Sequence, residues 1–419
     1  MPSSDPHIPA PTERPPASRG VLGVIFLTVF LDLVGFGILI PLLPLYAESL
    51  GASGLVVGGI MAIYSFMQFL FSPIWGRWSD RIGRRPLMLF GTAGASVAYT
   101  IFALGAGFQG STALAIFFAA RMLAGFCGAN LAVAQAAIAD VTPPELRSKR
   151  MALIGIAFGL GFIFGPAIGG LSLKHFGLAG PGWVACGLCA INFVAAFFLL
   201  PETRRPGAEA VKPRPRLEQW FATLRHPQIG TLVLVFFLST FAFACFETTL
   251  GLLVSKNFNL DFKGKDAGTI AGLFVFCGVI GVLAQGGLIG RLLKVFGEGK
   301  LIALSLVLAG AALGPLPFLQ SWLPLYLALA VLSLGSSLTR PPVFGLISKL
   351  AHADEQGATL GVAQSAGSLA RIAGPLFASF LFFQNPTWPY LACSALCLIT
   401  AGVVMMLLLP RLRRGENPT

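Results

Sequence analysis

The stretch Gly76-Arg77-Trp78-Ser79-Asp80-Arg81-Ile82-Gly83-Arg84-Arg85-Pro86 separates two long apolar runs, at residues 55–75 and 87–108. Each run is long enough to cross a bilayer, which takes about 20 apolar residues. Gly76 and Gly83 permit a tight turn, and the clustered arginines favour the cytoplasmic side of a membrane. The stretch therefore predicts a short cytoplasmic loop between two membrane-spanning helices.

The composition of the whole chain also indicates an integral membrane protein. The chain has 419 residues, of which 55% are hydrophobic and 11% are charged, whereas a soluble domain is roughly a quarter charged. A net charge of +12 would suggest a nucleic-acid partner in a soluble protein. In a membrane protein, Lys and Arg gather in cytoplasmic loops, so we expect the lipid bilayer as a partner and no nucleic acid.

Along the whole chain, on both sides of this loop in the sequence, twelve apolar segments are predicted to be membrane-spanning helices. They lie at residues 20–46, 54–76, 87–108, 112–140, 150–173, 180–200, 229–254, 266–290, 300–320, 322–349, 356–383 and 387–410. The chain is therefore expected to be an all-α membrane protein.

The connections divide these segments into two sets. We expect a six-helix bundle at 20–200, a hydrophilic cytoplasmic linker at 201–228 and a second six-helix bundle at 229–410. Residues 1–19 are expected to form a disordered cytosolic tail with no cleavable signal peptide, and residues 411–419 a second cytosolic tail.

The distribution of basic residues supports this topology. With the N-terminus in the cytoplasm, 22 of the 29 Lys and Arg residues fall in cytoplasmic segments, four fall outside and three fall within spans. Such an asymmetry follows the positive-inside rule. We therefore expect a multi-pass protein of the inner membrane of the cell, with both termini in the cytoplasm.

The two halves carry a weak internal repeat. Gly290-Arg291-Leu292 and Phe296-Gly297 echo Gly76-Arg77-Trp78 and Ile82-Gly83 at an offset of 214, and Gly374-Pro375 echoes Gly165-Pro166 at an offset of 209. Repeated six-helix halves with a substrate site at their interface are a common transporter plan.

All seven cysteines lie in apolar runs, including a Cys-x-x-Cys at Cys186 and Cys189. This spacing is compatible with redox or metal chemistry, but no His or carboxylate lies near it in sequence. We interpret the cysteines as small packing residues, and expect no metal site and no cofactor.

Five motifs resemble those of the major facilitator superfamily, in particular its 12-span drug:proton antiporter branch of tetracycline-efflux type. They are Gly76-x-x-x-Asp80-Arg81-x-Gly83-Arg84-Arg85 (the loop between helices 2 and 3), Arg121-x-x-x-Gly125-x-x-Gly128-Ala129 (helix 4), Gly161-Phe-Ile-Phe-Gly165-Pro166-Ala-Ile-Gly169-Gly170 (helix 5), Leu31-Asp32-Leu33-Val34-Gly35-Phe36-Gly37 with Pro41 and Pro44-Leu45-Tyr46 (helix 1), and Pro201-Glu202-Thr203 (the end of helix 6).

This resemblance implies a monomeric secondary transporter that works by alternating access and is not an enzyme. It implies multidrug efflux, and hence antibiotic resistance, through export of a hydrophobic or amphipathic small molecule in exchange for protons. Residues 266–290 contain no His, whereas tetracycline-type exporters carry one there, so tetracycline is not the expected cargo. A lipid or lysolipid translocator and a proton-coupled metabolite importer are the alternatives.

For the loop at 76–86, the resemblance implies a gate. Asp80 would latch the first half to a second-half helix in the outward-open state, and Arg84 would pair with Asp140. The other interpretation is that Arg81, Arg84 and Arg85 only fix topology. In the second-half copy Lys294 replaces the acid and Glu298 replaces an Arg, so that latch is reversed in sign or absent.

Small residues remove side chains from one face of the predicted fifth helix. They are Gly161, Gly165, Pro166, Gly169 and Gly170. Such a face suits close helix packing, and the resemblance adds a role in gating between rocking halves.

Charged residues within spans are costly and usually functional. Asp32, Arg121 and Glu247 are the predicted proton-coupling residues, because a carboxyl group in a low-dielectric medium is easier to protonate. The alternatives are a permanent Asp32–Arg121 ion pair, a Glu247 exposed at the rim, and an Arg121 that binds an anionic substrate.

Other residues of the same layer are candidates for the substrate cavity, although each polar one can instead satisfy a neighbouring helix. They are Gln68, Asn130, Gln135, Gln285, Gln364, Arg371 and the aromatic Phe241.

Overall fold

The computed structural model describes residues 19–142, 144–204, 216–260, 266–351 and 356–410. The tail expected at 411–419 lies outside the described residues, as does the tail expected at 1–19 apart from Arg19. Of the expected linker, residues 205–215 are likewise not described.

Within these ranges the chain folds into helices and contains no strand. The α-helices are α1 (Arg19–Leu39), α2 (Leu43–Ser49), α3 (Gly54–Ile82), α4 (Arg84–Gly105), α5 (Gly110–Gly128), α6 (Asn130–Asp140), α7 (Pro144–Phe176), α8 (Gly180–Leu199), α9 (Arg216–Arg225), α10 (Pro227–Asn257), α11 (Ala267–Leu283), α12 (Ile289–Leu313), α13 (Trp322–Leu350), α14 (Gln356–Gln384) and α15 (Trp388–Val403). Short π-helical segments at Ala284–Leu288 and Val404–Leu408 extend α11 and α15, and a 3₁₀ turn covers Leu316–Phe318.

Eleven stretches of the described chain are long and apolar enough to cross a membrane. One of them, Gly268–Phe318, has 51 residues, and a straight helix of that length would be more than twice as long as the ~30 Å hydrocarbon core. Gly297 interrupts α12 within this stretch with a φ of 71°, so the stretch makes two crossings. The prediction of an all-α fold with twelve spans is therefore confirmed.

The predicted fourth span, at 112–140, is not one continuous helix. It divides into α5 and α6 at Ala129, and the carbonyl oxygen of Gly128 accepts a hydrogen bond from Nε2 of Gln68 in α3 at 3.0 Å. A carbonyl at a helix end needs a partner in a membrane. The side chain of a neighbouring helix supplies it, and the break places Asn130 at the start of α6.

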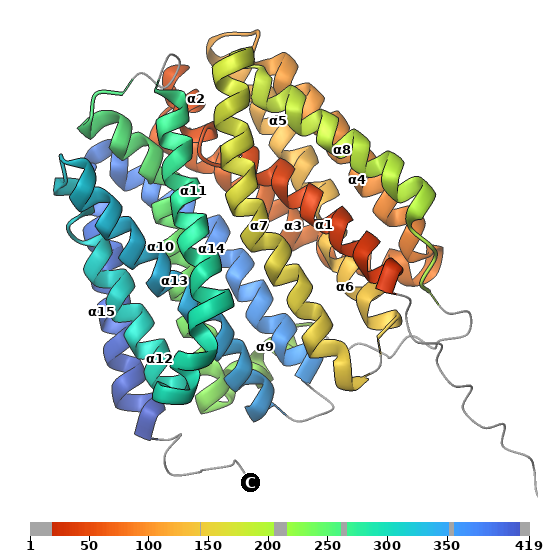
Figure 1. Cartoon of the computed structure of the whole chain (residues 1–419), viewed down its shortest axis with the longest axis vertical. Helices are drawn as coiled ribbons and strands as arrows, with labels where there is room; N and C mark the ends of the chain where they lie inside the picture. The colour runs from red at the N-terminus through yellow and green to blue at the C-terminus, as the bar shows by residue number, and fades with distance from the viewer. Residues whose placement is uncertain (1–18, 143, 205–215, 261–265, 352–355, 411–419) are drawn as a thin grey trace, which may run out of the picture.

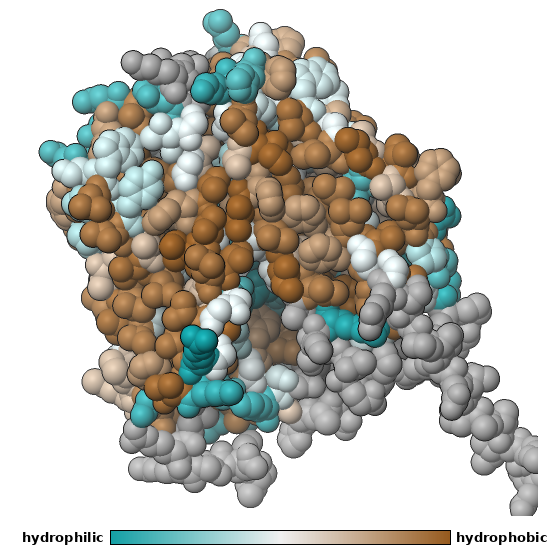
Figure 2. All heavy atoms as spheres, in the orientation of Figure 1, coloured by the Kyte–Doolittle hydropathy of each residue, from teal (hydrophilic) through white to brown (hydrophobic). Residues whose placement is uncertain are grey.

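Figure 1 shows α1 to α8, coloured red to yellow-green, gathered on one side and α10 to α15, green to blue, on the other. The two sets meet most extensively where α3 packs on α14 and where α7 packs on α11. Figure 2 shows a broad hydrophobic band across the middle of this face, with hydrophilic residues gathered above and below it. This pattern is the one expected of a surface that lies in lipid.

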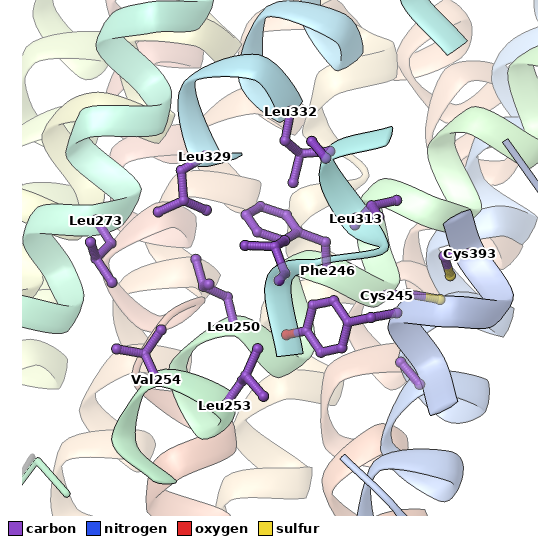
Figure 3. Packing of buried hydrophobic residues seen from close by; sticks show 14 of the residues in the cluster. Cys245, Phe246, Leu250, Leu253, Val254, Leu273, Leu313, Leu329, Leu332 and Cys393 are labelled. Atoms are coloured by element: carbon purple, nitrogen blue, oxygen red, sulfur yellow. The ribbon is translucent and has the colours of Figure 1, made fainter. Parts of the chain in front are cut away.

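Apolar side chains fill the space between α10 and its neighbours. Phe246, Leu250 and Leu253 of α10 pack with Leu313 of α12 and Leu329 of α13 in one buried cluster, as Figure 3 shows. This packing fixes the place of α10 within its set of helices, and with it that of the one acid that α10 carries, Glu247.

The bundle has two distinct ends. We call the end where α3 meets α4 at Gly83 the basic end, because it carries the arginines of the loop at 76–86. Close approaches between the two sets lie away from it: a Cβ atom on Gly58 would be 2.8 Å from Cα of Leu376, and one on Gly251 would be 3.2 Å from the carbonyl oxygen of Pro41. The two sets are therefore tightly joined at the opposite end.

Candidate functional site

Asp32 is half-buried in the middle of α1 and is held by two amides. Nδ2 of Asn192 in α8 donates to its Oδ1 at 2.9 Å, and Nδ2 of Asn130 in α6 donates to its Oδ2 at 3.2 Å. Both asparagines are buried. Neutral donors stabilise a carboxylate without cancelling its charge, so this acid is anchored by partners that carry no charge of their own.

Arg121 of α5 is only 2% exposed and is held by aromatic rings. Its guanidinium carbon lies 4.6 Å from the ring centroid of Tyr64 and 5.4 Å from that of Phe36. Its Nε and Nη1 are buried and have no hydrogen-bond partner. A cation with unsatisfied N–H groups in a low-dielectric interior is costly, and its donors can satisfy an anion.

The permanent Asp32–Arg121 ion pair, considered as an alternative from the sequence, is contradicted. Asp32 has the two asparagines as partners, and the described residues contain no ion pair that includes Arg121. The aromatic rings of Phe36 and Tyr64 hold the guanidinium instead.

Glu247 of α10 is not exposed at the rim, which was the other interpretation of this acid. It is half-buried, and its Oε1 is buried without a hydrogen-bond partner. The charges that act on it most are those of Arg371 in α14 and Arg121 in α5, yet neither forms an ion pair with it among the described residues. Glu247 is thus influenced by one cation from each set of helices.

Two further arginines lie in the second set of helices. Arg340 of α13 donates from Nη2 to Oε1 of Gln364 at 3.3 Å and lies 5.3 Å from the ring of Phe344. Arg371 donates from Nη2 to Oγ of Ser368 at 3.4 Å. Among the residues that the structure describes, the middle of the bundle therefore holds three arginines, at 121, 340 and 371, against two acids, at 32 and 247.

The remaining cavity candidates do not all lie together. Gln68 bonds the neighbouring helix, as described above, and Gln285 is exposed, with a 3.5 Å contact from its Nε2 to the carbonyl oxygen of Ser337. Gln135 is half-buried in α6, and Phe241 packs 5.3 Å from Phe377. Of these four, Phe241 comes closest along the chain to one of the interior charged residues just described, since it lies six residues before Glu247.

At the basic end, Arg84 is the centre of a charge triad. Its Nη2 lies 2.6 Å from Oδ1 of Asp80, and its Nε lies 2.9 Å from Oδ2 of Asp140. It also donates to Oγ of Ser79. The ion pair expected between Arg84 and Asp140 is thus present, and Asp80, expected to reach the second half, contacts Arg84 in this conformation.

Glu202, which follows α8 in the sequence, holds the loop at 76–86 through hydrogen bonds. Its carboxylate accepts the backbone N–H groups of Arg84 at 2.9 Å and Arg85 at 3.1 Å, at the N-terminus of α4. Burial alone would raise its pKa, but these bonds and those from the N–H groups of Arg204 and Thr203 hold the pKa of Glu202 below its usual value. Gly83 has a φ of 116°, and a Cβ atom there would collide with this carboxylate.

Three glycines of α7, at 161, 165 and 169, face α1 and not the second set of helices. A Cβ atom on Gly165 would lie 2.6 Å from Cα of Gly37, and one on Gly161 would lie 2.9 Å from Cβ of Leu33. The described contacts therefore agree with close packing within one set, and α7 meets α11 through a different face, where Ile163 lies against Gly278.

Sequence reasoning missed Asn192 and did not assign Glu202 to the site. Asn192 is a polar residue within an otherwise apolar span, and such a residue in a membrane usually has a specific partner. That signal was available, but which acid it faces depends on how α8 packs on α1.

The chain was compared with known proteins. The model of the family described as Major Facilitator Superfamily matches residues 25–292 and 286–419. The tetracycline resistance protein, class E, of Escherichia coli is 32% identical over 369 residues, covering 86% of this chain and 87% of that protein. Multidrug resistance protein 2 of Bacillus subtilis (strain 168) is 28% identical over 390 residues, covering 91% and 94%.

Among solved structures, the human organic anion transporter MFSD10 (TETRAN) matches with a TM-score of 0.68 and 27% identity, covering 93% of this chain and all of that one (100%). A bacterial homologue of the human lysosomal transporter Spinster, in an inward-facing and occupied conformation, matches with a TM-score of 0.74 and 13% identity, covering 97% and 100%. The second likeness concerns the fold alone.

Proposed function

The chain belongs to the major facilitator superfamily, and on that premise we propose that it exports hydrophobic or amphipathic compounds in exchange for protons. The transport cycle would alternate access by rocking of two units, residues 20–200 and 229–410. The basic end would face the cytoplasm, as its arginines favour. The chain would act as a monomer in the inner membrane, and export of drugs would confer resistance.

The observation that carries this proposal is the state of the two interior acids. Asp32 has only neutral amide partners and Glu247 has an unpartnered oxygen. An acid locked in an ion pair would stay charged throughout a cycle, whereas these two can each take up a proton. The tetracycline and multidrug resistance proteins to which the chain is similar support efflux as the direction.

Asp32 and Glu247 lie in different sets of helices, and Arg121 and Arg371 both act on Glu247. Rocking of the two units would change the distance between Glu247 and Arg121. Loss of a nearby cation makes protonation of a carboxylate easier. Proton uptake would thereby be linked to conformation, as antiport requires.

An anionic cargo is a second candidate. Arg121 is buried with unsatisfied donors, and the three interior arginines outnumber the two acids. The structural relative MFSD10 is an organic anion transporter. A cargo with a carboxylate or sulfonate group would satisfy Arg121.

The experiment is transport by the purified protein in liposomes under an imposed pH gradient. A fluorescent amphipathic cation, an amphipathic carboxylate and a fluorescent lysolipid serve as probes, with and without an ionophore that collapses the gradient. Gradient-driven movement of either of the first two probes is the expected result. A transport rate that does not depend on the pH gradient, or movement of the lysolipid alone, would overturn the proposal.

Glu247→Gln and Glu48→Gln form a matched pair in this assay. Both changes remove one acid from the half of the bundle that lies away from the basic end. Glu247 is half-buried there, whereas Glu48 is exposed in α2. We expect the first change to abolish coupling and the second to leave it intact.

A further inference from the structure

Arg340 of α13 is a half-buried cation that has no acid as a partner. Among the described residues it forms no ion pair and a single hydrogen bond, from its Nη2 to Oε1 of Gln364 in α14 at 3.3 Å. The charged residue that acts on it is another arginine, Arg371. A charged side chain within a membrane span is costly and usually serves a function. Its surroundings lack a negative charge, which a ligand could supply.

Two aromatic rings fix the orientation of this guanidinium group. Its Cζ lies 5.3 Å from the ring centroid of Phe344 and 5.8 Å from that of Phe236 in α10. The two rings meet edge to face, with their centroids 4.9 Å apart. Aromatic rings hold an arginine by the face of its planar group, and the N–H donors point outward from the edge of that group. Arg340 is therefore held in place to receive a carboxylate or sulfonate.

Gly367 of α14 makes room for one of these rings. A Cβ atom on Gly367 would lie 2.7 Å from Cε1 of Phe236, so a side chain there would displace the ring. Gly367 follows Gln364 by three residues, which is about one helical turn. The same turn of α14 thus supplies the hydrogen-bond acceptor of Arg340 and the space for the ring that contacts it.

A polar strip on α14 continues from Gln364 towards the middle of the bundle. Gln364, Ser368 and Arg371 lie at positions i, i+4 and i+7, on one face of the helix, and all three are half-buried. Nη2 of Arg371 donates to Oγ of Ser368 at 3.4 Å. Gln364 and Arg371 are about 10 Å apart along the axis of α14. Two arginines, one bound to Gln364 and one further along, therefore follow each other on this side of the interior.

Arg340 is nearer to the basic end of the bundle than Arg371 is. Helix α14 starts at that end, because Gly58, near the start of α3, lies against Leu376, near the end of α14. Gln364 lies eight residues beyond the start of α14, which corresponds to about 12 Å. A compound that enters the bundle from the basic end therefore passes Arg340 before it reaches Arg371.

We propose that Arg340, with the aromatic wall formed by Phe236 and Phe344, is a loading subsite that selects amphipathic anions, with aryl carboxylates and sulfonates as the class of ligand. This inference rests on the export cycle of the proposed function and names the cargo that it admits. The subsite is separate from Arg121, which belongs to the first set of helices.

The two parts of such a ligand have different partners. Its anionic group accepts charge-assisted hydrogen bonds from the guanidinium of Arg340, and its ring lies against the aromatic wall. A cation of the same shape meets Arg340 and then Arg371. Two like charges in succession disfavour it, so repulsion adds to the selectivity.

The test is binding to the purified full-length protein, measured by isothermal titration calorimetry with naphthoate and with naphthylmethylammonium, a cation that carries the same ring system. We expect naphthoate to bind more tightly than the cation by about tenfold or more. Arg340→Gln should weaken naphthoate binding by about tenfold or more, as the loss of a charged hydrogen-bond partner does. Arg340→Lys keeps the charge and should recover part of this loss, which separates a binding defect from a folding defect.

Arg291→Gln is the matched control, because it removes an exposed arginine of the second set of helices and lowers the net charge by the same amount. Wild-type affinity in Arg340→Gln, or an equal loss in Arg291→Gln, would overturn the subsite, as would tighter binding of the cation. Displacement of naphthoate by millimolar chloride would assign Arg340 to an inorganic counter-ion and would also overturn it.

The binding measurement needs no pH gradient, so its outcome is separate from that of the transport assay. Naphthoate that binds through Arg340 but does not move in response to the gradient would reject the proposed function and leave the subsite. Gradient-driven export of an amphipathic cation, without binding of naphthoate, would reject the subsite and leave the proposed function.

Discussion

Asn192 donates to Asp32 across 2.9 Å, from α8 to α1, and so anchors an acid in the interior of the bundle with a neutral partner. Arg121, which the sequence offered as one possible counter-ion of Asp32, lies instead against the rings of Tyr64 and Phe36. A neutral anchor leaves the carboxyl group able to change its charge.

The first prediction concerns Asp32→Asn. This change preserves the size of the side chain and removes the ionisable group, so proton-driven transport should fall to the background rate while cargo still binds. Transport in proteoliposomes and a ligand-induced thermal shift measure the two effects. Wild-type coupling in this variant would exclude Asp32 as a proton carrier.

The second prediction concerns the bond itself. Asn192→Ala leaves Oδ1 of Asp32 without its donor and should destabilise the protein by about 1–3 kcal/mol. In a double-mutant cycle with Asp32→Asn, the two costs should not add, because the residues are in contact. Thermal unfolding in detergent measures all four proteins, and strict additivity would argue against the bond.

The third prediction concerns Gly83→Ala. The added Cβ meets both an unfavourable positive φ and the carboxylate of Glu202, so we expect a loss of about 1–3 kcal/mol in stability. Gly110→Ala is the control, since Gly110 has a φ of 57° and open space around it. A similar loss in both variants would show that backbone strain alone matters.

The fourth prediction concerns pH. Because the folded protein lowers the pKa of Glu202, this carboxylate stabilises the fold above the ordinary Glu pKa of about 4.3. The contribution is lost as the pH falls through the lowered folded value. The difference in melting temperature between wild type and Glu202→Gln should therefore be largest at neutral pH and shrink in acid.

Glu218→Gln, which changes an exposed carboxylate in α9, is the control for the pH series. It should leave the melting temperature close to that of wild type throughout. A difference for Glu202→Gln that stays constant between pH 7 and pH 3 would contradict the assigned role.

Much of the chain's architecture follows from its sequence alone. Apolar length, the short arginine-rich loop at 76–86 and the repeat offsets predicted twelve helical spans, because each depends only on composition and order along the chain. The ion pair between Arg84 and Asp140 was implied by resemblance, and it is present. The break at Ala129 was missed, because the bond from Gln68 that satisfies Gly128 comes from another helix.

Only the tertiary structure decided which partner each interior charge has. Asp32 and Arg121 are both costly in a membrane, and the sequence left open whether they pair. The packing of α8 on α1 gives Asp32 the amide of Asn192, and the approach of α3 gives Arg121 the ring of Tyr64. A charge in a low-dielectric interior is governed by atoms within a few ångströms, and these atoms come from helices that are far apart along the chain.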